Sequence, residues 1–256
     1  MVGVAVTGAA GRMGREVLAA AADRDAVDVV FAVNRSPVEE PVAGVEVESS
    51  DAFAALVADH EPDVVVDFTG PESAVGYAEA CADHGVALVT GTTGFDEDGL
   101  TNLQSASEST AVLKASNFSR GVAALRLAVQ EATAALPDAD IELTETHHNA
   151  KRDAPSGTAK TLLDDIQDVR EDLSERVHGR EGEAPRSTDE IGVHARRAGD
   201  VAGEHEVLLG GSNETLSLIH RAGDRSIFAD GALDAAVWLA GREVGWYDFF
   251  EVIRGE

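Results

Sequence analysis

The sequence has little cysteine and no long apolar run, and both shortages narrow the possible classes of protein. Cys81 is the single cysteine among 256 residues, so an intrachain disulfide is impossible and a cysteine-based zinc site is excluded. No unbroken apolar run approaches the ~20 residues that a membrane span requires, and the first residues lack the basic and then apolar pattern of a signal peptide. We therefore expect a cytoplasmic protein with no membrane partner.

Basic residues are also scarce. The chain has 20 Lys and Arg against 47 Asp and Glu, a formal net charge of −27, and its lysines are Lys114, Lys151 and Lys160. A negative field of this size repels phosphate groups, so we expect no nucleic-acid partner. The acidic residues are spread along the chain. We interpret them as an adaptation to high salt, where screening removes self-repulsion; the alternative is an ordinary acidic cytosolic protein.

The first half of the chain alternates short β-rich apolar runs with Ala/Leu-rich helical patterns. This order is typical of an α/β fold, and we predict a Rossmann-type, doubly wound parallel sheet. The expected strands are Val2–Thr7, Val27–Val33, Asp63–Phe68, Val86–Thr90 and Ala111–Ala115. The expected helices between them are Arg12–Ala22, Asp51–Ala58, Glu72–His84 and Glu97–Ser109.

The pattern changes after a further helix at about Arg120–Leu136, and we predict a second, α+β domain with a mixed or antiparallel sheet. Its expected strands are Ile141–His147, Glu190–Ala195, Gly203–Leu209 and Thr215–His220. Gly210–Asn213 is a hairpin signal, Ser156–Arg170 is helical, and Val177–Asp189 reads as a mobile loop. The domain boundaries follow as 1–119, 120–225 and a C-terminal helical segment, 226–256, whose run Ile227–Gly241 is expected to return to the first domain.

A glycine-rich segment joins the first predicted strand to the first helix. Gly8, Gly11 and Gly14 have the spacing G-x-x-G-x-x-G, at the position where a dinucleotide fingerprint stands. Glycine lets the backbone approach a pyrophosphate, whose charge is favoured at a helix N-terminus, and Arg12 can add a side-chain contact. The alternative is a tight turn that merely needs glycine. We favour a dinucleotide-binding first domain.

Asn34 stands 20 positions after Gly14, at the end of the second predicted strand, and Arg35 follows it. An acidic residue there would accept the ribose hydroxyls of NAD, whereas Asn with an adjacent Arg tolerates or binds a 2′-phosphate. This favours NADPH, with NADH also usable, unless Arg35 only begins a solvated loop. The loops Gly91–Phe95 and Ser116–Ser119 also follow strands and suit the nicotinamide end, although each alone is more typical of a turn.

The stretch THHNAKRDAPSGT, residues 146–158, combines two imidazoles with further charged groups. Adjacent residues on a strand point to opposite faces, so His147 and His148 are poorly placed to share a metal ion, and we expect no metal site. His147 or Lys151 can move a proton, and N–H groups at the start of the following helix can bind a carboxylate. The alternative is a capped helix with two surface histidines. Beside a nicotinamide domain, the stretch predicts reduction of a C=N or conjugated C=C bond in an acidic metabolite.

Several strings occur in an order that resembles one family. GAAGRMGR, DFTGPES, GTTGF, SNFSRGV, HHNAKRDAPSGTA and RAGDVAGEH together resemble the 4-hydroxy-tetrahydrodipicolinate (dihydrodipicolinate) reductases of the diaminopimelate route to lysine. The resemblance runs from about residue 3 to the end. It implies a homotetramer whose second domain, residues 120–225, carries the contacts to a small dicarboxylate substrate and to other subunits.

The resemblance also implies roles for individual residues. His147 and Lys151 would be the acid/base groups, with the order of proton transfers open, and His148, Gly157 and Thr158 would hold the substrate carboxylates. Hydride would pass to C4 of the ring as the 4-hydroxyl leaves as water. The residues that would line the cofactor are Gly8, Ala9, Ala10, Gly11, Arg12, Met13, Arg35, Gly91, Thr92, Thr93, Ala115, Ser116, Asn117 and Phe118.

One departure and two rival functions accompany the resemblance. Many family members carry an acidic residue where Asn34 stands, which puts a preference for NADH in doubt rather than the activity itself. A binding protein that responds to nicotinamide nucleotides would keep the fold without turnover, and a homoserine- or aspartate-type dehydrogenase would share the first domain. A sensor needs no proton donor, however, and the His147 and Lys151 pair is present.

Overall fold

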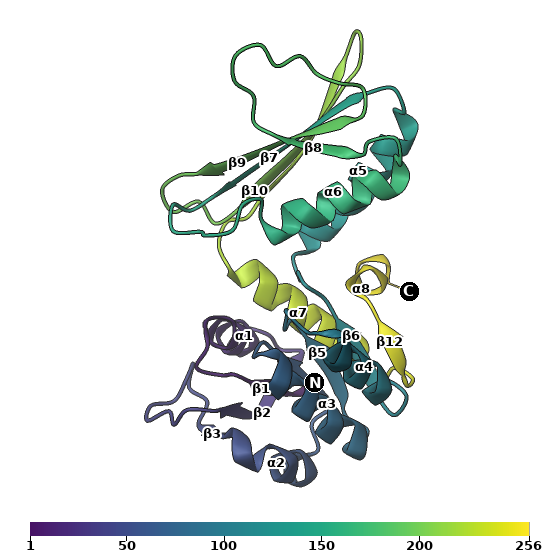
Figure 1. The fold of residues 1–256 in the computed structure, drawn as a ribbon. Helices are drawn as coiled ribbons and strands as arrows, with labels where there is room; N and C mark the ends of the chain where they lie inside the picture. Colours follow the sequence, from purple (N-terminus) through teal and green to yellow (C-terminus); the bar gives the residue numbers. More distant parts are fainter. Residues whose placement is uncertain (256) are drawn as a thin grey trace. The chain divides into compact units, whose positions relative to one another are not determined.

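The computed structural model describes residues 1–255, and the chain divides into two compact units (Figure 1). The first unit comprises residues 1–119 together with the described part of the chain from Arg225 onward, and the second comprises Arg120–Asp224. Within the described residues, no helix is both long and apolar enough to span a membrane.

The first unit is built on one seven-stranded sheet in the order β12-β6-β5-β4-β1-β2-β3, and every neighbouring pair is parallel. The six strands β1 to β6 thus follow the spatial order 3-2-1-4-5-6 of a doubly wound dinucleotide fold, and β12 is added at the edge beside β6. The strands are β1 (Val2–Thr7), β2 (Val27–Asn34), β3 (Val47–Ser49), β4 (Val64–Asp67), β5 (Ala87–Thr90), β6 (Ala111–Lys114) and β12 (Gly245–Tyr247). The predicted Rossmann-type sheet is confirmed.

Helices cover both faces of this sheet, which explains why its central strands are apolar up to their last residues: Val64, Val65 and Val66 of β4 are all fully buried. One face packs against α2, α3 and α4, and the other against α1 and α7. The helices are α1 (Arg12–Ala22), α2 (Phe53–His60, after a 3-10 turn at Ser50–Ala52), α3 (Pro71–His84), α4 (Glu97–Ala106), α7 (Ser226–Leu239) and α8 (Phe249–Arg254).

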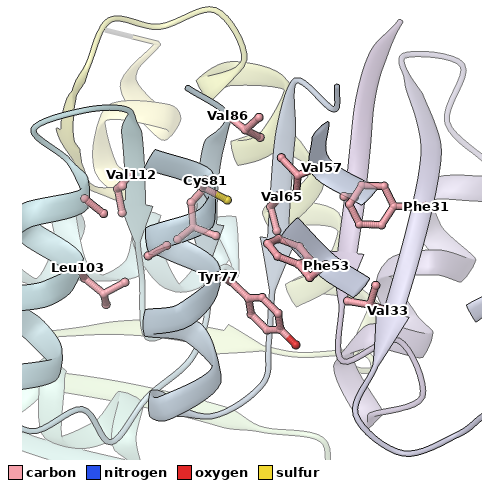
Figure 2. Close-up of a cluster of buried hydrophobic side chains, with 14 residues drawn as sticks. Phe31, Val33, Phe53, Val57, Val65, Tyr77, Cys81, Val86, Leu103 and Val112 are labelled. Carbon is pink, nitrogen blue, oxygen red and sulfur yellow. The ribbon is translucent and has the colours of Figure 1, made fainter. Parts of the chain in front are cut away.

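The core on the α2–α4 side contains an aromatic cluster (Figure 2). The Phe53 ring of α2 lies 6.0 Å from the ring centroid of Phe31 on β2 and 4.5 Å from that of Tyr77 on α3. Cys81 is buried in the same core, where burial raises the pKa of its thiol above the ordinary value. The single cysteine is therefore a packing residue, held as the unreactive thiol.

The second unit pairs a five-stranded mixed sheet, in the order β11-β10-β7-β9-β8, with two helices. Strands β10 and β11 form an antiparallel hairpin, β10 pairs antiparallel with β7, and β7, β9 and β8 run parallel. The strands are β7 (Asp140–His147), β8 (Glu175–His178), β9 (Glu190–Arg197), β10 (Glu204–Gly210) and β11 (Thr215–Arg221), and the helices are α5 (Arg120–Ala135) and α6 (Gly157–Val169).

One face of this sheet packs on α5 and α6 around a separate core. Alternate residues of β7, Ile141 and Leu143, point into it beside Leu162 of α6 and Val207 of β10. The alternation continues along β7, so Glu145 and His147 lie on this same face. A hydrophobic stripe thus ends in a carboxylate and an imidazole.

Some sequence predictions were wrong in detail. Val177 and His178, predicted as part of a mobile loop, belong to β8, which pairs with β9. The predicted helix Glu97–Ser109 ends at Ala106, because residues 107–109 form turns. The short elements β3, β12 and α8 were not predicted. The hairpin at Gly210–Asn213 and the strands on either side of it are confirmed.

Candidate active site

The glycine-rich loop lies at the carboxyl end of β1, where open α/β sheets bind ligands. Gly8 adopts φ +64°, a left-handed conformation that disfavours other residues. A Cβ at Gly14 would lie 2.2 Å from the Gly8 carbonyl oxygen, so α1 and the loop approach each other more closely than any side chain allows. Glycine at these positions therefore serves a close backbone approach as well as a turn.

The N-terminus of α1 is suited to an anion. Its N-cap is Gly11 in extended conformation, and within the described chain no side chain caps the helix and no acidic residue occupies its first turn. The N–H groups of the first turn and the positive end of the helix dipole therefore have no acidic side chain of that turn beside them. This cradle fits the pyrophosphate of a dinucleotide, which is the group that such a loop binds.

A buried carboxylate ties together the ends of three strands. Asp67, at the end of β4, accepts hydrogen bonds from the hydroxyls of Thr7 (2.7 Å), Thr69 (2.6 Å), Thr90 (2.8 Å) and Thr92 (2.7 Å). The Thr92 hydroxyl in turn accepts from the backbone N–H of Thr69 at 3.0 Å. We call Asp67 and its four threonines the threonine cluster. It fixes the loops that follow β1, β4 and β5 relative to one another.

Asn34 connects the glycine loop with the segment after β2. Its Oδ1 accepts from the Ala10 N–H at 3.3 Å, and its Nδ2 donates to the Ser36 carbonyl at 2.8 Å. A pocket beside it is lined by Ala10, Arg15, Asn34 and the segment from Ser36 to Pro41. Arg35 is exposed at the end of the strand. Arg15 was not predicted as a site residue, although it is the next arginine after Arg12.

The other two predicted cofactor loops are held by packing. A Cβ at Gly91 would lie 2.0 Å from the Phe68 ring, so only glycine fits there. Phe118 is fully buried, with its ring 5.7 Å from that of Phe68 and 5.2 Å from that of Phe249. It can therefore offer a ligand its backbone but not its ring. Thr93 and Ser116 are exposed, and Ala115 donates its N–H to the Thr90 carbonyl.

In the second unit, strand register gathers four polar side chains at one end of the sheet. His147 of β7 lies opposite Arg197 of β9, and Glu145 lies opposite His205 of β10. His147 Nδ1 is 2.6 Å from Glu145 Oε2, and the two imidazoles of His147 and His205 meet edge to face with centroids 5.3 Å apart. Arg197 donates to both carboxylate oxygens of Glu145, at 2.9 and 2.7 Å.

The environment controls the protonation of these groups. Burial opposes ionisation of Glu145, but hydrogen bonds from Arg197 and His147 outweigh it and hold the pKa of its carboxyl below the ordinary value. Burial lowers the pKa of His147, against the opposing effect of Glu145. His205 is buried and beside His147, which lowers its pKa to about 4. At neutral pH, both imidazoles are therefore neutral and Glu145 is a carboxylate.

The loop between β7 and α6 carries the other predicted residues. Lys151 Nζ lies 2.8 Å from Asp153 Oδ1, and the Lys151 N–H donates to the His148 carbonyl. Ser156 caps α6: its hydroxyl accepts from the Ala159 N–H at 3.2 Å, ahead of Gly157. His147, His148, Lys151, Gly157 and Thr158 thus belong to one strand end, one loop and one helix start of the second unit.

Sequence reasoning missed Asp67, Glu145, Arg197 and His205. The signal for Glu145 was available, because a charged residue two positions before His147 continues the apolar stripe of Ile141 and Leu143. Arg197 and His205 are the first and last residues of RAGDVAGEH, a string of the resemblance that implied no role for either, and only the register of β9 and β10 brings them to His147. Among the described residues, no group of three His, Cys, Asp or Glu side chains is placed to hold a metal ion.

Comparison with known proteins decides the family. The family model described as dihydrodipicolinate reductase, N-terminus, matches residues 2–118, and the model described as dihydrodipicolinate reductase, C-terminus, matches residues 121–253. The chain belongs to the dihydrodipicolinate reductase family. As a member, it is an oxidoreductase that uses a pyridine nucleotide, in agreement with the glycine cradle of its first unit.

Relatives and solved structures agree with this membership. The 4-hydroxy-tetrahydrodipicolinate reductase of Natronomonas pharaonis is 54% identical over 250 residues, 98% of this chain and 99% of the relative. That of Haloarcula marismortui is 54% identical over 253 residues, 99% of each chain. The dipicolinate-bound dihydrodipicolinate reductase from Paenisporosarcina sp. TG-14 superposes with a TM-score of 0.82 at 26% identity, over 97% of both chains.

Proposed function

We propose that the chain reduces 4-hydroxy-tetrahydrodipicolinate to tetrahydrodipicolinate, with NAD(P)H as hydride donor, in the diaminopimelate route of lysine biosynthesis. The observation that carries the proposal is family membership over nearly the whole chain, with relatives of this activity at 54% identity. The site adds the chemistry: an anion cradle in the first unit, and a His/Lys pair ahead of a capped helix in the second.

Bound NAD(P)H supplies the hydride, and residues of the chain hold the cofactor and the substrate. The glycine cradle, from Gly8 to Met13, binds the pyrophosphate, and Gly91 to Thr93 with Ala115 to Phe118 line the nicotinamide end. In the second unit, His148, Gly157 and Thr158 bind the substrate carboxylates at the start of α6, where N–H groups and the helix dipole favour an anion.

The reaction also needs a proton, because the 4-hydroxyl leaves as water while hydride adds at C4. His147 and Lys151 are the groups that hold and move this proton. The low pKa of His147 keeps it mostly neutral at pH 7, whereas the Lys151 ammonium is paired with Asp153. Both residues remain candidates for protonating the departing hydroxyl.

The first experiment follows NADPH and NADH absorbance separately with freshly made enzymatic 4-hydroxy-tetrahydrodipicolinate, at low and high KCl. We expect oxidation of the nucleotide that requires this substrate. Binding of NADPH without turnover at any salt concentration would instead support a nucleotide sensor. Preference for an open-chain semialdehyde would support a dehydrogenase of the homoserine or aspartate type.

NADPH is the proposed preferred cofactor. Asn34 puts an amide rather than a carboxylate at the end of β2, Arg15 lines the adjacent pocket together with Glu39 and Glu40, and Arg35, the residue after Asn34, is exposed. We propose the guanidinium groups of Arg15 and Arg35 as the partners of a 2′-phosphate. We expect Arg35→Ala to raise the Kd for NADPH more than that for NADH, measured by fluorescence titration. Equal increases for the two nucleotides would refute the assignment of Arg35.

Residues 120–225 are proposed to bind substrate and to join subunits in a cytoplasmic homotetramer. The edge strand β11 supports this, because its Leu216 and Ile219 are 38% and 43% exposed, and apolar groups on a sheet edge favour association. Light scattering should give four chains per particle, and Ile219→Lys should lower that number. No nucleic-acid or membrane partner is proposed, since the net charge of −27 repels phosphate surfaces.

A further inference from the structure

Glu145 is a completely buried carboxylate with no role in the proposed proton transfers, yet it contacts His147 directly. Its Oε1 accepts from Arg197 at 2.7 Å and from the Ser156 N–H at 3.1 Å. Its Oε2 accepts from Arg197 at 2.9 Å and lies 2.6 Å from His147 Nδ1. Each oxygen therefore has two partners, and the orientation of the carboxylate is fixed by groups from β9 and from the start of α6.

This arrangement determines where His147 carries its proton. An ionised carboxylate offers only acceptor sites, so a ring nitrogen 2.6 Å away must donate to it. The neutral ring then has its proton on Nδ1 and its lone pair on Nε2. Glycine at position 203 leaves room beside that nitrogen, because a Cβ there would lie 3.1 Å from Nε2.

We propose that Glu145 is a positioning residue that holds the His147 proton on Nδ1, so that Nε2 is the nitrogen that exchanges a proton during turnover. The role of Nε2 in turnover rests on the proposed function. The tautomer of His147 does not, since it is a property of the free protein. Besides Glu145, the titratable and charged groups that face His147 are Lys151, Arg197 and His205.

Glu145→Gln should invert the tautomer. Each carboxylate oxygen accepts from Arg197, but the second partner of Oε1 is the Ser156 N–H, which can only donate, whereas the second partner of Oε2 is His147, which can change tautomer and accept. The amide oxygen of the glutamine is therefore favoured at the Oε1 position. Its NH2 group then occupies the Oε2 position and donates to His147 Nδ1. The ring must accept at Nδ1 and carry its proton on Nε2, so its reactive nitrogen is blocked. Loss of the correct tautomer in this way is the known effect of a carboxylate-to-amide change behind a catalytic histidine.

The chain offers a matched control on the same strand. Glu142 of β7 points to the opposite face, where its Oε2 lies 2.7 Å from His194 Nε2 and its Oε1 pairs with Arg186. Glu142→Gln therefore removes a charge that is also paired with an arginine and a histidine, at a position outside the proposed site. If loss of any paired carboxylate on β7 impaired the protein, both variants would be impaired.

The first measurement is the tautomer of His147 in the ligand-free protein, by long-range ¹H–¹⁵N correlation with ¹⁵N-histidine, the signals being assigned with His147→Asn. We expect Nδ1–H in the wild type and in Glu142→Gln, and Nε2–H in Glu145→Gln. A wild-type ring protonated on Nε2 would overturn the proposal without any variant. So would an unchanged tautomer in folded Glu145→Gln.

The second measurement is steady-state turnover. We expect Glu145→Gln to lower kcat by about 10²- to 10⁴-fold, as for loss of an acid/base group, with KM changed only a few-fold and Glu142→Gln near wild type. A Glu145→Gln variant with full kcat would exclude the positioning role. Failure of the wild type to reduce the substrate would count against the proposed function instead, because the tautomer measurement needs no substrate.

Discussion

Lys151 is one of three lysines in a strongly acidic chain, and its ammonium pairs with the exposed carboxylate of Asp153 in the loop before α6. An ion pair of this exposure contributes little to stability, so its removal should leave the fold intact. We expect Lys151→Ala to lower kcat by about 10²- to 10⁴-fold while NADPH binding is retained. Lys160→Ala, an exposed lysine on α6, is the control, and full turnover by Lys151→Ala would remove Lys151 from the mechanism.

His205 couples the site to stability through pH. Its pKa is about 4 in the folded chain against the ordinary 6.5, so between these values the unfolded chain binds more protons than the native one. Stability should therefore fall as pH drops from about 6.5 toward 4, by on the order of 3 kcal/mol from this residue. Urea unfolding at fixed KCl would measure the slope.

The matching variant is His205→Gln, whose amide can still reach Ser156 Oγ, 3.1 Å from His205 Nε2 in the wild type. This variant should have a shallower slope of unfolding free energy between pH 4 and 6.5. Some slope should remain, because burial also lowers the pKa of His147 and His220. An identical slope in the variant and the wild type would show that His205 is not the residue that titrates.

The residues of the candidate site divide according to how far the sequence could predict them. The string from Thr146 to Thr158 keeps His147, Lys151 and Gly157 in one short segment, so one strand end and one helix start were enough to group them. Arg197 and His205 depend on which strand pairs with which, and in which register. That information comes from long-range packing of the second unit, which no local pattern contains.

At the scale of elements, the junction of the glycine loop with α1 is a close backbone-to-backbone contact in the cofactor site. Gly14→Ala would place a methyl 2.2 Å from the Gly8 carbonyl oxygen, so the helix must move away from the loop. We expect a lower Tm and weaker NADPH binding. The control is Gly76→Ala in the middle of α3, where nothing lies within 4 Å of the new methyl and the unfolding free energy should rise by about 0.5–1 kcal/mol.

If Gly14→Ala bound NADPH as tightly as the wild type and unfolded at the same temperature, the close approach would not matter to the cradle. A Gly76→Ala variant that lost NADPH binding would show that a change in α3 also affects cofactor binding, and Gly76→Ala would then not serve as a control. Thermal unfolding followed by circular dichroism, with and without NADPH, distinguishes these outcomes.

Long apolar elements were predicted well, and short ones were not. The ranges Val2–Thr7 and Arg12–Ala22 agree residue for residue, because each has a full period of buried positions. Strands β3, β8 and β12 have three or four residues and lie at sheet edges, where pairing with a neighbour rather than intrinsic pattern makes the strand. A mixed or antiparallel second sheet was predicted, but the order of its strands was not.

For the whole molecule, the net charge of −27 is the dominant property. Screening shortens the reach of charge repulsion from about 10 Å at 0.1 M salt to about 3 Å at 1 M, so the folded state should gain stability as KCl rises. We expect Tm to increase between dilute buffer and molar KCl. Fully cooperative unfolding in dilute buffer, with no gain from salt, would refute adaptation to high salt.

A control for the salt response changes the net charge of the chain with little change in side-chain shape. Glu39→Gln with Glu40→Gln removes two exposed carboxylates from the segment after β2, so its Tm should depend less on KCl than that of the wild type. Equal dependence would point to salting-out of apolar surface rather than to screening.

The threonine cluster places a limit on how the sequence can diverge. Four hydroxyls from the ends of β1, β4 and β5 satisfy one buried carboxylate, so replacing any threonine with valine leaves Asp67 short of a donor while keeping the shape. Once Asp67 itself is replaced by an apolar residue, the same four hydroxyls become the unsatisfied groups. We therefore expect these five positions to change together, and library design in this region should vary them jointly.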